Sequence, residues 1–259
     1  MLPREELLHG SQWPDSLAQA LDGAERALKI WEVSVTDFLS PPACAEIQQR
    51  LERLSDIQTL ARGGFAQAER QRLGIARAQV PLDAAQVPLA ALDLGGNFLF
   101  DTATHRDFLE AILGAGVARE QVGDILVLGE GGAQVVLAPE GVPVLEAELG
   151  YVRSVPVKVR PIGLDELKVR PLQTKELTAV EPSLRLDAVA SAGFGLSRRK
   201  TAAAIERGEV RLNWREVTQP SQAVSPGDAI ALQGKGRVVV GEVSTTKKGR
   251  YRIALTRYR

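Results

Sequence analysis

The chain has 259 residues, of which 44% are hydrophobic and 25% charged, a composition that excludes wholesale disorder. No uncharged apolar run reaches about 20 residues and the first residues lack the pattern of a signal peptide, so neither membrane insertion nor secretion is expected. One cysteine, Cys44, and two histidines, His9 and His105, argue against a disulfide and a zinc site. We therefore expect a cytoplasmic protein with no metal and no cofactor.

The formal net charge of zero hides a strong asymmetry along the chain. Residues 182–259 hold 15 Lys+Arg against 6 Asp+Glu, a net charge of +9, whereas residues 1–181 hold 17 against 26, a net charge of −9. Such a split predicts a basic module that meets a polyanion, carried on an acidic body. The alternative is a charged face that is merely solvated.

Residues 1–80 are predicted to be mostly helical. A helix is expected from Pro14 to about Trp31, a break at Pro41-Pro42, and a second helix over 43–54. Next, Gly63-Gly64 predicts a tight turn before a charged helix that contains Arg70 and Arg72, two arginines that would add a basic spot. The Gly-Lys-Ser/Thr of a phosphate loop is missing, so a nucleotide site is not expected here.

Residues 81–162 alternate strand, helix, strand, strand, helix and strand, the βαββαβ order of a ferredoxin-like (RRM-like) domain. Thr104 is predicted to cap the first helix, with Asp107 in its first turn. The expected elements are a strand at Leu89–Phe100, a helix from His105, strands at Asp124–Leu128 and Ala133–Ala138, a helix at Val142–Leu149 and a strand at Val155–Pro161. Residues 163–181 are predicted to be a linker.

No catalytic residue is predicted in these regions. The segment 92–97 resembles the first motif of a cofactor-binding methyltransferase, but Phe98-Leu99-Phe100 is expected to continue the strand instead of opening a helix. Neighbours such as His105 and Asp107 on one helix do not face each other as a triad requires. Cys44 lies among helix formers and is interpreted as a buried thiol.

Residues 182–259 are interpreted as two short helices followed by strands. Ser197 is a suitable N-cap for the second helix, Gly208 is predicted to end it, and Ala229–Leu232 is a predicted strand after a Pro-Gly-Asp turn. The buried stripe of the second helix is predicted at Thr201, Ala204 and Ile205. Asp187 is expected to be a structural carboxylate at a helix start, paired with Arg185.

Four motifs occur in order in this segment: Arg185-Leu186-Asp187, Ser197-Arg198-Arg199-Lys200, the hairpin residues 208–214 and Pro226-Gly227-Asp228. Over about residues 183–232 they resemble the S4 RNA-binding domain, named after ribosomal small-subunit protein four. The resemblance implies an α+β fold in which an αα-hairpin packs on a small sheet, with one basic face for structured RNA. The candidate RNA-binding residues are Arg185, Ser197, Arg198, Arg199, Lys200, Arg211, Trp214, Arg215, Lys235, Arg237, Lys247, Lys248 and Arg250.

A narrower resemblance rests on Trp214, which replaces the usual hairpin glycine, and on the basic segments 234–237 and 247–250. Together with Gly63-Gly64-Phe65 and His105–Phe108, they are similar to YlmH-type proteins. The resemblance implies a non-enzymatic protein that binds rRNA or tRNA on the large ribosomal subunit, in quality control or assembly. Trp214, Phe194 and Tyr251 are candidates to stack on unpaired bases, although Phe194 is expected in the core.

Two alternatives remain at this point. One is an RNA-modifying enzyme, either like a methyltransferase or like a pseudouridine synthase, since those synthases carry a catalytic aspartate in a motif similar to Arg185-Leu186-Asp187. The other is a scaffold of cell division or photosystem assembly. The sequence gives no indication of the oligomeric state or of which RNA is bound.

Overall fold

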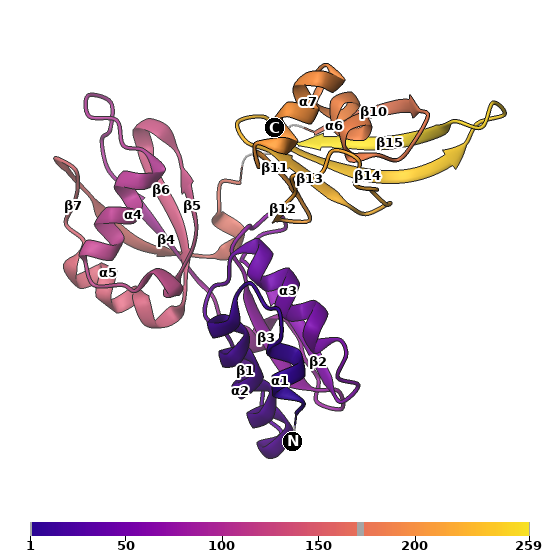
Figure 1. Ribbon diagram of the computed structural model, residues 1–259. Coiled ribbons are helices and arrows are strands. Elements are labelled where there is room, and N and C mark those ends of the chain that lie inside the picture. The colour runs from indigo at the N-terminus through magenta and orange to yellow at the C-terminus, as the bar shows by residue number, and fades with distance from the viewer. Residues whose placement is uncertain (1, 170–173, 259) are drawn as a thin grey trace. The chain divides into compact units, whose positions relative to one another are not determined.

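The computed structural model describes residues 2–169 and 174–258, and the chain forms two compact units, residues 1–169 and residues 170–259 (Figure 1). Helices and strands are mixed in both units, which confirms the predicted α+β class. In the described part of the chain, no helix is long and apolar enough to cross a membrane.

The N-terminal part of the first unit is a helical layer on a small sheet. Its elements are α1 (Arg4–Leu8), α2 (Pro14–Ile30), β1 (Ser34–Val35), α3 (Pro41–Leu51), β2 (Ile57–Arg62) and β3 (Arg72–Arg77). The strands pair antiparallel in the order β1-β3-β2, and α2 and α3 pack on this sheet through a shared apolar core. The two predicted helices are present as α2 and α3, but the expectation of a mostly helical region missed this sheet.

Two local predictions also differ from the structure. Pro41 and Pro42 begin α3 instead of breaking the chain, since a proline at the first helical positions lacks only an N–H that would have no helical partner. No helix follows Gly63-Gly64: the chain turns and enters β3, whose first five residues are all buried. A strand buried on both faces shows no alternation, which explains the wrong prediction.

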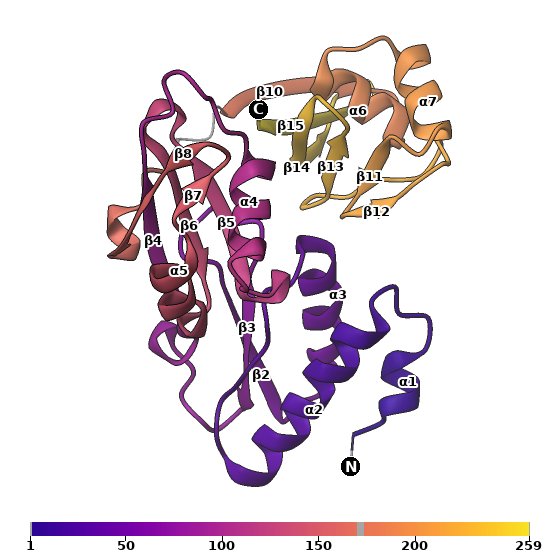
Figure 2. The ribbon, with the colours of Figure 1, turned by 90° about the vertical axis from the view of Figure 1, so that its left-hand side faces the viewer.

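The middle of the first unit has the predicted ferredoxin-like fold. Its elements are β4 (Ala90–Gly95), α4 (His105–Gly114), β5 (Val122–Val127), β6 (Gly132–Leu137), α5 (Val142–Glu148), β7 (Tyr151–Val152), β8 (Val155–Pro156) and β9 (Lys158–Ile162). The antiparallel sheet has the order β5-β6-β4-β9, and α4 and α5 share one core with it (Figure 2). The first strand ends at Gly95, so the expected continuation to Phe100 was wrong, and β7 and β8 form an additional hairpin.

The second face of this sheet is covered by other segments of the same unit. Phe38, Phe65 and Leu164 pack against Val136, which lies on β6. Arg70 donates hydrogen bonds to the carbonyl oxygens of Val122, Phe38 and Arg119, at 2.8, 2.8 and 3.3 Å. Burial, followed by the charge of Arg119, lowers the pKa of Arg70 to about 10.

Arg72 is buried as well, and it donates to the carbonyl oxygens of Thr36 and Pro88. The expected basic spot at Arg70 and Arg72 was therefore wrong, because both guanidinium groups bind backbone carbonyls inside the unit.

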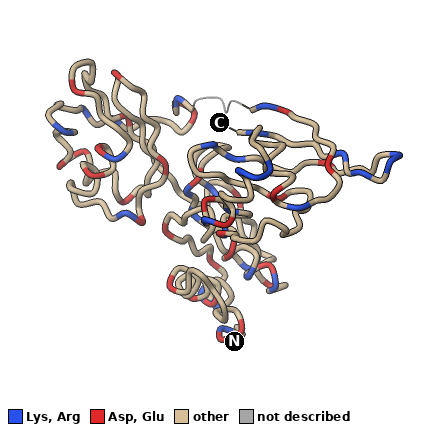
Figure 3. The backbone as a smooth tube through the Cα atoms, turned by 45° about the horizontal axis from the view of Figure 1, so that its top comes forward, with Lys and Arg blue, Asp and Glu red and all other residues tan. Residues whose placement is uncertain are grey.

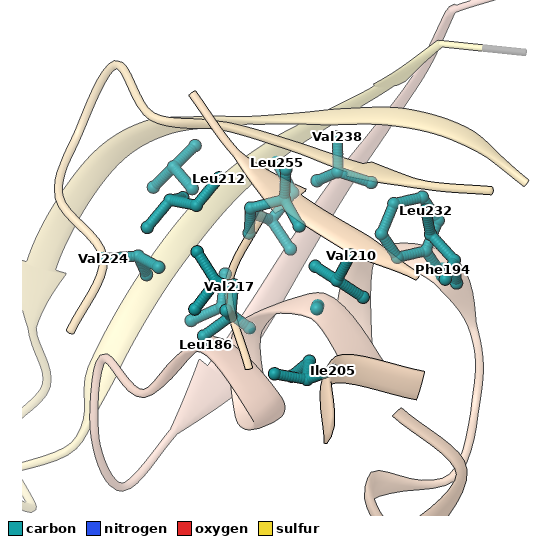
Figure 4. Packing of buried hydrophobic residues seen from close by; sticks show 14 of the residues in the cluster. Leu186, Phe194, Ile205, Val210, Leu212, Val217, Val224, Leu232, Val238 and Leu255 are labelled. Atoms are coloured by element: carbon teal, nitrogen blue, oxygen red, sulfur yellow. The ribbon is translucent and has the colours of Figure 1, made fainter. Parts of the chain in front are cut away.

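The second unit is a pair of helices on a six-stranded sheet. Its elements are β10 (Thr174–Glu181), α6 (Leu186–Phe194), α7 (Arg198–Glu206), β11 (Val210–Leu212), β12 (Arg215–Glu216), β13 (Ala229–Leu232), β14 (Gly236–Thr245) and β15 (Tyr251–Tyr258). The sheet order is β10-β15-β14-β13-β11-β12, and its core residues lie between the sheet and the helices (Figure 4). Phe194 is 3% exposed and lies in this core, as predicted.

The predicted linker 163–181 is only partly a linker. Residues 170–173 lie outside the described residues, whereas β10 pairs with β15 along all eight of its residues, from Thr174 opposite Tyr258 to Glu181 opposite Tyr251. The reason for the error is that this partner strand lies about 75 residues away along the chain, beyond the reach of a local pattern.

Candidate nucleic-acid interface

The start of α7 has the geometry that its sequence predicts. Ser197 accepts a hydrogen bond from the backbone N–H of Lys200 through its hydroxyl at 3.3 Å, and Thr201, Ala204 and Ile205 form the buried stripe. A helix start carries free N–H groups and a partial positive charge. The side chains of Arg199 and Lys200 are exposed in this first turn, so cationic groups and helix dipole act together there.

Asp187, in the first turn of α6, links the two helix starts. Its carboxylate, 8% exposed, accepts hydrogen bonds from Arg185 at 3.1 and 3.2 Å and from Arg198 at 3.2 and 3.2 Å. Burial acts to raise the pKa of Asp187, but the hydrogen bonds and charges of the two guanidinium groups outweigh it, and the pKa is lowered from its ordinary value. The predicted pairing of Asp187 with Arg185 is present, and Arg198 is a second partner that was not predicted.

These ion pairs change the expected role of two candidate residues. Arg185 and Arg198 keep 43% and 46% of their side chains exposed, so part of each guanidinium group faces solvent. Their charges are nevertheless shared with Asp187. We therefore assign them first to holding α6 against α7, and only second to contact with a ligand.

The strand register places two of the other candidates, Arg211 and Arg237, on one face of the sheet. Residues directly opposite each other on neighbouring strands share a face. Arg237 lies opposite Tyr258 on β15 and Ala231 on β13, and Ala231 lies opposite Arg211 on β11. The adjoining residue Val238 is fully buried under the helices, so Arg237, Arg211 and Tyr258 lie on the opposite face, which we call the open face.

An aromatic and cationic cluster lies at one end of the open face. The guanidinium carbon of Arg237 is 4.9 Å from the ring centre of Tyr258 and 5.7 Å from that of Trp214. A pocket of about 350 Å³ adjoins Arg211 and Ala231. Flat rings beside guanidinium groups offer surfaces on which unpaired bases stack.

The hairpin that presents Trp214 has an unusual backbone. Both Asn213 and Trp214 have positive φ, 48° and 68°, a combination that suits a tight hairpin turn but strains a residue as large as tryptophan. The turn is held by Asn213, whose side-chain oxygen accepts from the Ala229 N–H and whose side-chain nitrogen donates to Asp228, at 2.8 and 2.7 Å. The hairpin asparagine and the Pro-Gly-Asp turn of the sequence pattern are thus joined in space.

The remaining basic residues lie elsewhere. Lys247, Lys248 and Arg250 are exposed at the tip of the β14–β15 hairpin, and the blue segments of Figure 3 mark this tip. Since a strand advances about 3.3 Å per residue, the ten positions from Arg237 on β14 to Lys247 separate this tip from Arg237 by about 30 Å. Arg215 and Lys235 are exposed nearer the cluster, at β12 and in the β13–β14 turn. The structure thus brings the candidates together as three groups: the α7 start, the open face and the hairpin tip.

Sequence reasoning missed Tyr258 as a member of the open-face cluster. Burial of Ile253 and Leu255 at alternate positions of β15 is the pattern that identifies a strand there, and Tyr258 lies on its other face, yet which face is which depends on pairing with β14. Tyr251, a predicted stacking candidate, is half-buried and packs against the core of the second unit.

In the first unit, the residues considered as catalytic make local structural contacts. The Thr104 hydroxyl accepts a hydrogen bond from the Asp107 N–H at 3.4 Å, which is the predicted helix cap, and the Asp107 carboxylate in turn accepts from the N–H and the hydroxyl of Thr104, both at 2.7 Å. Arg106 pairs with Glu110 at 2.7 Å. Burial raises the pKa of the Cys44 thiol to about 11, which disfavours the reactive thiolate at neutral pH.

Three family models match the chain. The model of the YlmH N-terminal domain matches residues 14–80, that of the proposed RNA-binding domain of YlmH matches residues 86–166, and that of the S4 domain matches residues 184–230. The two YlmH models together cover more than half of the 259 residues.

Two known proteins are similar to the chain. A curated protein of Bacillus subtilis (strain 168), named "Ribosome-associated protein quality control protein P2", is 28% identical over 240 residues, which cover 92% of this chain and 93% of that protein. A solved structure described as "Cell division protein ylmH from Streptococcus pneumoniae" has a TM-score of 0.54 and 17% identity, and covers 62% of this chain and 98% of that one. At this identity, the likeness to the solved structure concerns the fold alone.

Proposed function

The chain belongs to the YlmH family, and on this premise we propose that it binds structured RNA, either rRNA or tRNA, on the large ribosomal subunit. In this proposal it acts without catalysis, in ribosome-associated quality control or in assembly, and it works in the cytoplasm with ribosomal particles. The name of the Bacillus subtilis relative supports the link to ribosomes.

The observation that carries the proposal is the concentration of positive charge on the second unit, residues 170–259, which contains the S4 match and which we call the S4 unit. Residues 182–259 have a net charge of +9, and its exposed cations occupy the α7 start, the open face and the hairpin tip. Binding of a polyanion releases condensed counterions, which favours association of such a surface with RNA. Structured RNA is recognised largely through its backbone and shape, so a strict base-reading pattern is not required.

We assign a different RNA contact to each of the three groups of candidate residues, the α7 start, the open face and the hairpin tip. Arg199 and Lys200 contact phosphates at the α7 start, where the helix dipole assists them. Trp214 and Tyr258 stack on unpaired bases, with Arg237 and Arg211 beside them. The hairpin tip contacts a second stretch of backbone about 30 Å away.

The position of Asp187 favours RNA binding over RNA modification. A nucleophilic aspartate must reach its substrate, whereas this carboxylate is 8% exposed and binds two guanidinium groups. Its lowered pKa follows from these ion pairs at a helix start.

RNA binding by separate fragments tests this proposal. Residues 170–259 should retain most of the affinity of the whole chain for purified large-subunit RNA or tRNA, because they carry the charge and their own core. The fragment must include β10, because a start at residue 180 removes most of the strand that pairs with β15. Equal affinity of residues 1–169 and the whole chain would refute the assignment.

Salt dependence and charge reversal provide the second test. If four to six phosphates are neutralised, log affinity should fall against log salt with a slope of about −3 to −5. Arg199→Glu with Lys200→Glu should weaken RNA binding without unfolding, whereas Lys175→Glu, an exposed change on β10, is the matched control. Unchanged affinity in the double variant would exclude the α7 start from the interface.

A further inference from the structure

The middle domain of the first unit has a charge that is unfavourable for binding RNA. Residues 86–166 hold 5 Lys+Arg against 12 Asp+Glu, a net charge of −7. The net electrostatic interaction of this domain with phosphate groups is therefore repulsive, in contrast to that of the S4 unit, whose net charge is +9. The charge of this domain therefore favours a partner other than a polyanion.

The sheet face that RRM-like domains offer to RNA is also occupied. In an RRM, aromatic side chains on the central strands stack on bases. Here the corresponding residues of β4 and β6, those opposite the helical layer, are Ala91, Asp93, Gln134 and Val136, none of them aromatic. Phe38 and Phe65 pack on Val136, and Gln134 accepts from the Lys168 N–H at 2.6 Å.

The same domain presents apolar side chains on a different surface, the loop between β4 and α4. Phe100 is 91% exposed and Leu99 is 50% exposed, in a chain whose other phenylalanines include the fully buried Phe98 and Phe108. Tyr151 on the neighbouring β7–β8 hairpin is 65% exposed. We call these three residues, Leu99, Phe100 and Tyr151, the apolar patch.

The loop that carries the patch is held on both sides. Before it, Phe98 is fully buried, its ring centre 5.2 Å from that of Phe108, and its N–H donates to the Glu130 carbonyl at 3.0 Å. After it, Asp101 accepts from the Ser154 hydroxyl at 2.5 Å and pairs with Arg153 at 2.8 Å. Phe100 is therefore presented to solvent by a fixed loop, with little ordering left to occur on binding.

We propose that the apolar patch docks on a basic protein of the ribosomal particle, an inference that rests on the proposed function. Exposed aromatic residues on a fixed loop are typical anchors of protein interfaces. The middle domain that carries the patch has a net charge of −7, which attracts a cationic partner. The S4 unit contacts RNA, and the middle domain contacts protein.

Crosslinking on purified large subunits identifies what the patch contacts. A photo-reactive phenylalanine analogue replaces Phe100 in the full chain, and a second chain carries it in place of Glu146, an exposed residue of α5, as the control. We expect position 100 to crosslink to a basic ribosomal protein, with a yield well above that of position 146. A crosslink mainly to rRNA, or a yield equal to the control, would overturn the proposal.

Affinity measurements separate this inference from the proposed function. Phe100→Ser with Tyr151→Ser should weaken binding of the full chain to large subunits about tenfold, and leave its affinity for naked RNA unchanged. Equal losses for particles and naked RNA, or no loss for particles, would overturn the protein contact while RNA binding stands. Failure of the wild-type chain to bind large subunits would refute the ribosomal function together with this inference.

Discussion

Reversing the charge of Arg198 should lower the free energy of unfolding of the S4 unit, in addition to any direct effect on RNA binding. Arg198 donates two hydrogen bonds of 3.2 Å to Asp187, a carboxylate that is 8% exposed. The substitution Arg198→Glu removes these bonds and places a second carboxylate beside the first. Lys200→Glu, two residues along the same helix, changes an exposed side chain and is the matched control.

The magnitude follows from the contacts. A hydrogen bond between charged groups contributes about 1.5–3 kcal/mol, and the lower end applies because 46% of the Arg198 side chain is exposed. Two like charges about 4 Å apart repel by about 4 kcal/mol at the effective dielectric of a protein surface, and rotation of the new side chain into water removes about half of this. We expect Arg198→Glu to cost about 3 kcal/mol, Arg198→Ala about 1.5 kcal/mol, and Lys200→Glu under about 0.5 kcal/mol.

Denaturation followed at Trp214 measures these costs in the S4 unit. Replacing Trp13 and Trp31 by phenylalanine in the full chain leaves Trp214 as the one indole, and it lies in the second unit. Urea midpoints then give the change in the free energy of unfolding for each variant. If Arg198→Glu and Lys200→Glu unfold at the same urea concentration, the argument that Asp187 joins the two helix starts is wrong.

Further predictions concern acidity, packing and the hairpin. The pKa of Asp187 is lowered in the folded state, so its ionised form stabilises the fold above the unfolded pKa of about 3.9. This contribution is lost as the pH falls through the lower folded pKa. The urea midpoints of the wild type and of Asp187→Asn should therefore converge below about pH 4. Gly63→Ala should destabilise the first unit by about 2–3 kcal/mol in thermal unfolding, because the new Cβ lies 2.4 Å from the Ala68 Cβ and 2.6 Å from the Arg70 carbonyl oxygen. The control Gly131→Ala, whose Cβ meets open space, should cost under about 0.5 kcal/mol. Trp214→Gly should change the free energy of unfolding by less than about 1 kcal/mol, because relief of the positive φ offsets the lost contact with Arg237. The same variant should lower RNA affinity several-fold in a titration. Full RNA affinity would remove Trp214 from the interface.

Local signals in the sequence predicted the starts of two helices correctly. Thr104 and Ser197 cap α4 and α7 as expected, because an N-cap is determined by a side chain and a backbone N–H three residues apart. The ferredoxin-like order was predictable for a similar reason, since the apolar period of each element is read within a short window.

Long-range pairing accounts for what was missed. β10 is mostly polar and alternates only weakly, and its place in the sheet depends on β15 at the other end of the second unit. The bond between Asp187 and Arg198 joins two helices, and no spacing rule links residues eleven positions apart across a turn. The separation of the candidate cations into three groups likewise depends on strand register, which the sequence alone did not determine.

The length of the β14–β15 hairpin determines the distance between two groups of cations, the open face and the hairpin tip. Insertions or deletions in the two strands would change this distance in steps. β10 pairs with β15 along the whole length of β15, so the hairpin is part of a three-stranded sheet and resists bending better than a lone hairpin would. Inserting two residues in each strand would move the tip lysines outward by about 7 Å and keep every side chain on its face, whereas inserting one would turn the outer part over. The length of the hairpin therefore changes in useful steps of two residues, and its present ten residues in β14 determine the distance between the tip cations and Arg237. Under the proposed function, this distance is the spacing of the two stretches of RNA backbone that these groups contact.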